Sequence, residues 1–261
     1  MKILFVGDIV GKQGRRAVRE LLPSLIAARM VDLVIGNCEN AAAGFGVTRE
    51  VIEELYANNL DVLTSGNHIW DKKEVLEFID DYETLLRPAN FPQGVPGGGS
   101  VVMPTSIGVA VAVLNLMGRV FMRPLECPFR TAEREIAALK RKTPIVFVDM
   151  HAEATSEKQA LGWFLDGKAS AVVGSHTHVQ TADERILPGG TAYITDAGMT
   201  GPFDSIIGIK KEPILERFFT QMPNKFDVAT GDIRLQGVII EVDQQTGRST
   251  GIERLSVKLE A

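Results

Sequence analysis

Short apolar runs alternate along the first part of the chain with longer segments in which apolar residues recur at helical spacing. The short runs have the length and the β-branched content of buried strands. A repeat of strand and helix predicts a largely parallel, buried sheet with helices packed against it. The expected strands are residues 2–6, 32–37 and 61–67, and the expected helices are residues 14–30, 48–59 and 71–80.

Three residues bear on how these helices begin and run. Thr48 stands at the start of the helix expected at 48–59, and we expect its hydroxyl to cap that helix. Glu50 lies in the first turn, where the helix dipole favours negative charge. Pro23 falls inside the helix expected at 14–30, and we expect it to break or kink that helix.

The pattern changes twice in the rest of the chain. Residues 87–100 are rich in proline and glycine and predict a loop, not a domain linker, because strand-like residues resume directly after them. From Gly189 onward the strand-like runs become shorter, and residues 244–251 predict a hairpin turn. We therefore expect two sheets packed together with helices outside, as a single domain over residues 1–261. The remaining expected elements are strands at 101–104, 107–118, 191–198, 235–243 and 252–260, strand-to-loop segments at 144–151 and 170–178, and helices at 131–141 and 156–167.

The composition argues against several classes of protein. Hydrophobic residues make up 45% of the 261 residues and charged residues 23%, as in an ordinary soluble protein with a core. The net charge of −5 argues against a strongly basic nucleic-acid binder. The two cysteines, Cys38 and Cys127, are too few for a secreted disulfide scaffold and fit reduced thiols in a cytoplasm. The first apolar run is too short for a signal peptide, and no stretch approaches the ~20 apolar residues that span a bilayer, so we expect a cytoplasmic protein without a membrane partner.

All four histidines of the chain follow a strand-like apolar run. Carboxylate and amide residues follow such runs as well. The carboxyl ends of parallel strands line one crevice in an open α/β sheet, so we expect these loops to converge. The side chains that they would bring together are those of Asp8, Glu39, Asn40, Asn67, His68, His151, His176 and His178.

This mixture of carboxylate, amide and imidazole groups suits iron, manganese, zinc or cobalt. Calcium or magnesium alone would call for mostly oxygen ligands, and a structural zinc site would usually contain clustered cysteines. The candidate ligands are too many for one tetrahedral ion, but two ions ~3.5–4 Å apart that share a carboxylate would use them all. His176 and His178 lie two positions apart, which in an extended segment would put both on one face, each within reach of a different ion.

Several short motifs resemble, in order, the motif blocks of calcineurin-like metallophosphoesterases. They are "GD" at 7–8, "GNH" at 66–68, the histidine after a strand at 151 and "GSHTH" at 174–178. The chain departs from the usual pattern in lacking a histidine at position 10, in carrying "GNCEN" where the bridging aspartate is expected, and in having a serine between Gly174 and His176. Together with "GDIVGKQGR", "NAAAGFG" and "DAGMTGP", these departures resemble the YmdB-like bacterial branch nearly end to end.

The resemblance implies the metallophosphoesterase fold, an α/β, four-layer α/β/β/α sandwich of two mixed sheets flanked by helices. It also implies two metal ions per chain, iron first and Mn²⁺ second, and hydrolysis of cyclic nucleotide phosphodiesters, both 2′,3′-cyclic and 3′,5′-cyclic monophosphates. The implied ligands are Asp8, Asn40 and His178 for one ion, Asn67, His151 and His176 for the other, and Glu39 as the bridge, which leaves His68 free beside the second ion.

The expected mechanism uses the ions to polarise the phosphoryl oxygens and to lower the pKa of a water, so that hydroxide attacks phosphorus. His68 would act as general acid on the leaving ribose oxygen, with support of its own loop as the alternative role. Phe45 is a candidate for stacking on a base, against simple packing of its loop. Arg15 is a candidate for a phosphate contact, against a solvated position on a helix.

Two further interpretations of the function stay open at this point. One is a metal-holding regulatory protein that binds a cyclic nucleotide or RNA with little turnover. The other is an enzyme that acts on RNA or on a phosphomonoester, although the net charge gives no support to long RNA. The sequence leaves the oligomeric state open, a homo-oligomer included. It assigns Cys38 no role beyond a buried neutral thiol, and none to Ser175 or to residues 196–205.

Overall fold

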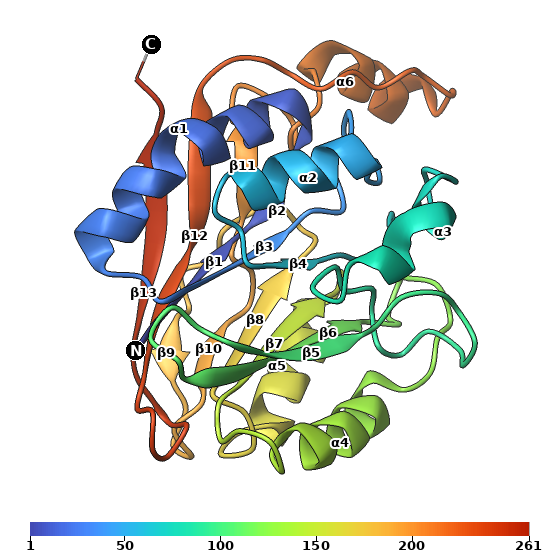
Figure 1. The fold of residues 1–261 in the computed structure, drawn as a ribbon. Helices are drawn as coiled ribbons and strands as arrows, with labels where there is room; N and C mark the ends of the chain where they lie inside the picture. Colours follow the sequence, from blue (N-terminus) through green and yellow to red (C-terminus); the bar gives the residue numbers. More distant parts are fainter. Residues whose placement is uncertain (261) are drawn as a thin grey trace.

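Two mixed β-sheets pack face to face in the structure, a computed structural model that describes residues 1–260 (Figure 1). The first sheet has the strand order β2-β11-β12-β1-β3-β4, with β13 also paired to β12. Its strands are β1 (Lys2–Val6), β2 (Asp8–Ile9), β3 (Leu33–Asn37), β4 (Val62–Thr64), β11 (Met199–Pro202), β12 (Ile233–Val242) and β13 (Ser249–Lys258).

The second sheet has the strand order β5-β6-β7-β8-β10-β9. Its centre is parallel, since β6, β7, β8 and β10 run in one direction, whereas β5 and β9 pair antiparallel at the edges. Its strands are β5 (Ser100–Pro104), β6 (Ala110–Met117), β7 (Val146–His151), β8 (Ala171–Ser175), β9 (Arg185–Ile186) and β10 (Ala192–Ile194).

Helices cover the outer faces of both sheets, which confirms the predicted four-layer α/β/β/α arrangement (Figure 1). The helices over the first sheet are α1 (Gly11–Arg29), α2 (Arg49–Ala57) and the short α3 (Val75–Phe78), which continues into the 3₁₀ turn Ile79–Asp81. The helices over the second sheet are α4 (Pro128–Leu139) and α5 (Thr155–Phe164), and α6 (Lys211–Thr220) lies between β11 and β12 in the chain.

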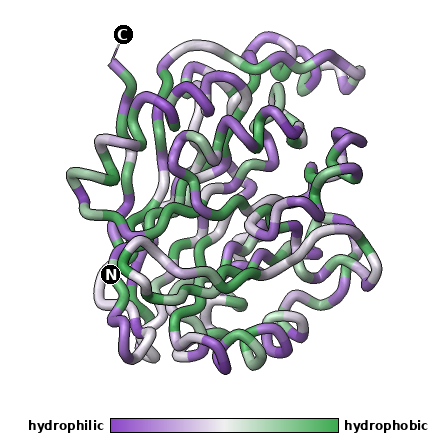
Figure 2. The backbone as a smooth tube through the Cα atoms, viewed as in Figure 1, coloured by the Kyte–Doolittle hydropathy of each residue, from purple (hydrophilic) through white to green (hydrophobic). Residues whose placement is uncertain are grey.

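Three apolar layers hold these elements together. Between the two sheets, side chains such as Ile3 and Val173 are fully buried, and the rings of Phe5 and Phe147 stack at 5.4 Å. The other two layers lie between each sheet and its helices. Figure 2 shows the same distribution, with hydrophobic residues along the central strands and hydrophilic residues on the outer parts of the helices.

None of the helices within residues 1–260 is long and apolar enough to cross a membrane.

The structure differs from the sequence expectations in four places. Pro23 lies on the exposed side of α1 and does not end it, because α1 continues to Arg29. The helix expected at 71–80 is limited to α3 and the 3₁₀ turn, and α6 was not expected at all. The first sheet is less parallel than the local repeat indicates, because the C-terminal strand β12 pairs antiparallel with β1.

The predicted N-terminal cap of α2 does form, since Thr48 Oγ1 accepts a hydrogen bond from the amide of Val51.

Candidate metal centre

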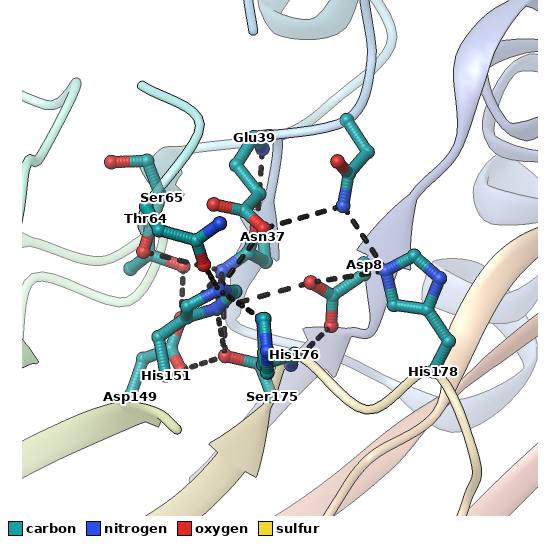
Figure 3. Close-up of polar contacts among 12 residues, drawn as sticks. Asp8, Asn37, Glu39, Thr64, Ser65, Asp149, His151, Ser175, His176 and His178 are labelled. Atoms are coloured by element: carbon teal, nitrogen blue, oxygen red, sulfur yellow. Dashed lines mark hydrogen bonds and ion pairs between the residues drawn. The ribbon is translucent and has the colours of Figure 1, made fainter. Parts of the chain in front are cut away.

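Polar side chains from five loops meet at one edge of the two sheets (Figure 3). Each side chain lies at or just beyond a strand end, because parallel strands bring their carboxyl ends to the same edge. The residues are Asp8 at the start of β2, Glu39 and Asn40 after β3, Asn67 and His68 after β4, His151 at the end of β7, and His176 and His178 after β8.

The first of two groups in the site is centred on Nε2 of His151. This nitrogen lies 3.0 Å from Glu39 Oε1, 3.1 Å from Asn67 Oδ1 and 3.0 Å from His176 Nδ1. One ligand atom each from Glu39, His151 and His176 lies within 4.8 Å of the others, which is compact enough for a single cation. Asn67, His151 and His176 are the residues that the family resemblance implies for one ion.

The second group is centred on Nε2 of His178. It lies 3.1 Å from Asn40 Nδ2 and 3.8 Å from Asp8 Oδ1. The Asn40 amide also donates to Glu39 Oε1 at 3.4 Å, so Glu39 contacts both groups. A carboxylate in this shared position has two oxygens with which to bridge two cations, as the resemblance implies for Glu39.

In each of the three histidines of these groups, the ring nitrogen that does not face the centre has a hydrogen-bond partner of its own. Nδ1 of His151 lies 2.9 Å from Ser175 Oγ, and Nδ1 of His178 lies 2.9 Å from the carbonyl oxygen of Ile207. Nε2 of His176 lies 3.1 Å from a carboxylate oxygen of Glu153. An imidazole that donates its N–H to such a partner presents the lone pair of its other nitrogen, which is the usual arrangement of a histidine bound to a metal.

Ser175 belongs to a buried network beneath His151 (Figure 3). Its hydroxyl donates to Asp149 Oδ1 at 2.6 Å and therefore accepts the N–H of His151. Asp149 is fully buried, and its other oxygen accepts hydrogen bonds from Thr64 Oγ1 and from the amide of Asn37. The network fixes the tautomer of His151 with Nε2 facing the centre.

The backbone that carries His176 and His178 is not extended, contrary to the sequence expectation. Both residues have positive φ angles, 99° and 64°, a region that side-chain-bearing residues rarely adopt. Thr177 between them donates both its amide and its hydroxyl to Asp196 Oδ2, at 3.1 and 2.8 Å. The buried ammonium of Lys158 contacts the same Asp196 oxygen at 2.7 Å. This turn, and not the pleat of a strand, directs the two histidines to different groups.

Residues 196–200 also hold Asp8 in place. The amide of Asp8 donates to the carbonyl oxygen of Gly198 at 3.1 Å, and Asp8 is paired with Met199 where β2 joins β11. The carboxylate of Asp8 then accepts the amide of His176 at 3.1 Å. The "DAG" segment, whose role is not apparent from the sequence, therefore fastens together the two loops that carry Asp8 and the histidine pair.

Burial and the charges of neighbouring groups shift the pKa values of the site in opposite directions. Burial raises the pKa of Asp8 to about 6, against the opposing effect of the neighbouring histidines. Burial would also raise the pKa of Glu39, but its ion pair with His151 and the amide of His68 lower it to about 2. Burial disfavours charge on His151, yet Glu39 and Asp8 raise its pKa to about 9. Burial and the charge of His151 lower the pKa of His176 to about 3.

These groups fit a bound cation. Asp8 Oδ1 is buried and has no hydrogen-bond partner among the described residues. Carboxylate and amide oxygens converge on Nε2 of His151, and the raised pKa of His151 shows that these surroundings favour a positive charge there. A metal ion would supply that charge and would satisfy Asp8 as well.

His68 stands apart from both groups. Its amide donates to Glu39 Oε2 at 3.0 Å, which places the residue beside the centre, and its Nδ1 lies 2.8 Å from Asp71 Oδ2. Its ring meets that of Phe45 edge to face, with centroids 4.9 Å apart. The other ring nitrogen, Nε2, is left for a group in the cavity.

A cavity of about 350 Å³ opens above the centre. His68 and Phe45 line it together with Glu39, Asn40 and His176. Arg15, the candidate for a phosphate contact, is not among its lining residues. Its guanidinium bonds Glu54 and the carbonyl oxygen of Ala41, so it holds the loop after β3.

Cys38 lies directly before Glu39 and is fully buried. Burial and the neighbouring charge of Glu39 raise the pKa of its thiol, so the sulfur is a neutral thiol that packs in the core, as expected.

Known proteins resemble this chain over nearly its full length. The profile of the YmdB-like protein family matches residues 4–255. The chain belongs to the YmdB-like family. It is 52% identical over 257 residues to the 2′,3′-cyclic-nucleotide 2′-phosphodiesterase of Bacillus subtilis (strain 168), a match that covers 98% of this chain and 97% of that protein.

Two solved structures share the fold over nearly their full length. A hypothetical protein from Thermus thermophilus superposes with a TM-score of 0.92 at 42% identity and covers 99% of both chains. A structure described as a novel phosphatase from Mycoplasma pneumoniae has the same TM-score at 35% identity, with 99% of this chain and 93% of that chain covered. These likenesses confirm the expected fold, and the curated relative supports a phosphodiesterase hydrolase.

Proposed function

We propose that this phosphodiesterase hydrolyses 2′,3′-cyclic nucleotides at a centre of two metal ions. The observation that carries the proposal is the pair of ligand groups that share Glu39 beneath an open cavity. The activity of the Bacillus subtilis relative supports the substrate class.

Each ligand group would hold one ion, with Glu39 as the bridge. The family resemblance makes iron the first expectation and Mn²⁺ the second, and the mixed carboxylate, amide and imidazole ligands suit both. When bound, the ions would polarise the phosphoryl oxygens and lower the pKa of a water towards neutrality. The ligands proposed for one ion are Asp8, Asn40 and His178, and those for the other are Asn67, His151 and His176.

His68 would protonate the leaving ribose oxygen as general acid. Its position beside Glu39 would bring it next to a phosphate bound at the centre, and the Asp71 carboxylate lies 2.8 Å from its Nδ1, so Nε2 would be the atom that gives up the proton.

Both cysteines are free thiols, which supports the cytoplasmic location expected from the sequence.

A steady-state assay of metal-loaded protein tests the proposal. Protein purified without oxygen is loaded with Fe²⁺ or Mn²⁺ and given 2′,3′-cAMP, 3′,5′-cAMP, a short RNA and a phosphomonoester. We expect turnover of 2′,3′-cAMP, loss of it with a chelator and its return when the metal is restored. The 3′,5′-cyclic substrate shows whether the larger ring is accepted. Tight binding of 2′,3′-cAMP without product would instead indicate a regulatory binding protein.

A further inference from the structure

The side chains that line the cavity above the metal centre are of two chemically different kinds, which we call its polar and its apolar side. One side is the polar centre itself, with Glu153 and Thr177 beside it. The other side is apolar, and its side chains come from three separate parts of the chain. They are Val10, Phe45, Ile207, Ile209, Ile214 and Phe226. The cavity volume of about 350 Å³ lies in the range of sites for small organic ligands.

Most of this apolar side belongs to one excursion of the chain, residues 207–229, which includes α6. Backbone hydrogen bonds close the base of the excursion, from Lys210 to Asp227 and from Ala229 to Gly208. Figure 1 shows α6 at the edge of the molecule, outside the two sheets. No residue of α6 is buried, so the helix adds nothing to the three apolar layers. What the excursion does supply is the apolar side of the cavity.

The excursion is joined directly to the metal centre. The carbonyl oxygen of Ile207 bonds Nδ1 of His178, while the same residue lines the cavity. The guanidinium of Arg217 lies over the ring of Phe226, 5.2 Å from its centroid, and helps to hold it in place. A substrate whose phosphate sits at the centre can therefore extend its organic part along Ile207 towards Ile214 and Phe226.

From this arrangement we infer that residues 207–226 form the subsite for the nucleobase and hold the base by its faces alone. The inference rests on the proposed function. The apolar side chains offer surfaces on which a flat ring system can lie, and none of them has a hydrogen-bonding group to read its edge. Stacking and apolar contact are tolerant of base identity, because every base has two π-faces. The enzyme should therefore require a base but should not distinguish strongly among the four.

The test compares the four 2′,3′-cyclic nucleotides with glycerol 1,2-cyclic phosphate, a cyclic phosphodiester without a base. We expect kcat/KM values within about tenfold of one another for the four nucleotides, and Phe226→Ala or Ile214→Ala to raise KM for each nucleotide by about tenfold with little change in kcat. Neither variant should change kcat/KM for the glycerol ester. The matched control is Phe219→Ala, because Phe219 lies on α6 with 85% of its surface exposed and does not line the cavity.

Three results would overturn the inference. They are equal loss on the glycerol ester and the nucleotides, an unchanged KM in both cavity variants, and a preference among bases well above a hundredfold. If one of these results is found while the wild-type protein still hydrolyses the glycerol ester, the inference about the base subsite fails and the proposed function stands. If the wild-type protein turned over no cyclic phosphodiester, the proposed function would fail. Calorimetric titration with the four nucleoside 3′-phosphates would then test the base subsite independently of turnover. We expect Phe226→Ala to bind each of them about tenfold more weakly than the wild type, and equal affinity would contradict the inference.

Discussion

The carboxylate of Asp71 lies 2.8 Å from Nδ1 of His68, three residues earlier in the chain. The amide of Asp71 also donates to the carbonyl oxygen of His68, so one turn joins the two residues through both backbone and side chain. The carboxylate faces Nδ1 of His68, which leaves Nε2 as the ring nitrogen that can donate a proton in the cavity. Asp71 is thus a positioning residue for the proposed general acid.

Removal of His68 should abolish proton transfer and leave the metal in place. We expect His68→Ala to lower kcat by ~10²-fold or more, with unchanged metal content by element analysis. Asp71→Asn should lower kcat by a smaller factor of about 10, and the two losses should not add, because both act through the same imidazole. Asp81→Asn, at an exposed aspartate paired with Arg49, is the matched control. Loss of metal in His68→Ala would show that the residue only supports its loop.

The hydroxyl of Ser175 links the ring of His151 to the buried carboxylate of Asp149. Ser175→Ala would leave the N–H of His151 and one oxygen of Asp149 without this partner. We expect the affinity for metal, measured by titration against a competing chelator, to fall about 10- to 100-fold. Ser249→Ala is the control, since that hydroxyl is also buried but bonds the carbonyl oxygen of Ser170 away from the centre. Equal metal affinity in Ser175→Ala and the wild type would show that the network does not orient His151.

The buried pair of Lys158 and Asp196 holds the strained turn at Thr177. Asp196→Asn would leave a buried ammonium without its counter-charge, a loss that typically costs about 3–5 kcal/mol. We expect a fall of that order in the free energy of unfolding in urea, with weaker metal binding in the protein that stays folded. Asp232→Asn, which removes a surface ion pair with Arg234, should leave the stability unchanged. A fully stable Asp196→Asn protein with normal metal content would contradict this role.

Local patterns were sufficient to predict most strands and the loops that carry the site, because buried strands and the residues after them are visible in short windows of sequence. The network beneath the site was not predictable in this way. Ser175 and Asp149 meet only because β7 and β8 are neighbours in the sheet, and Asp196 reaches Thr177 through tertiary packing.

The elements that were missed have physical reasons as well. The segment of α6 does carry apolar residues at helical spacing, namely Ile214, Leu215, Phe218 and Phe219, but the expectation of short strands after Gly189 passed over it, and none of its residues is buried in the core. The helix expected at 71–80 is shortened because Asp71 is engaged in the turn with His68. The antiparallel partner of β1 comes from the far end of the chain, and no local repeat indicates that pairing.

The central claim is that two metal ions share Glu39, and counting the ions tests it most directly. Element analysis of anaerobically purified wild-type protein should give two ions per chain. Glu39→Gln should hold at most one and lose turnover of 2′,3′-cAMP, because an amide bridges two cations far less readily than a carboxylate. A fully active wild-type protein with one ion per chain, or a Glu39→Gln variant that keeps both ions, would contradict the account.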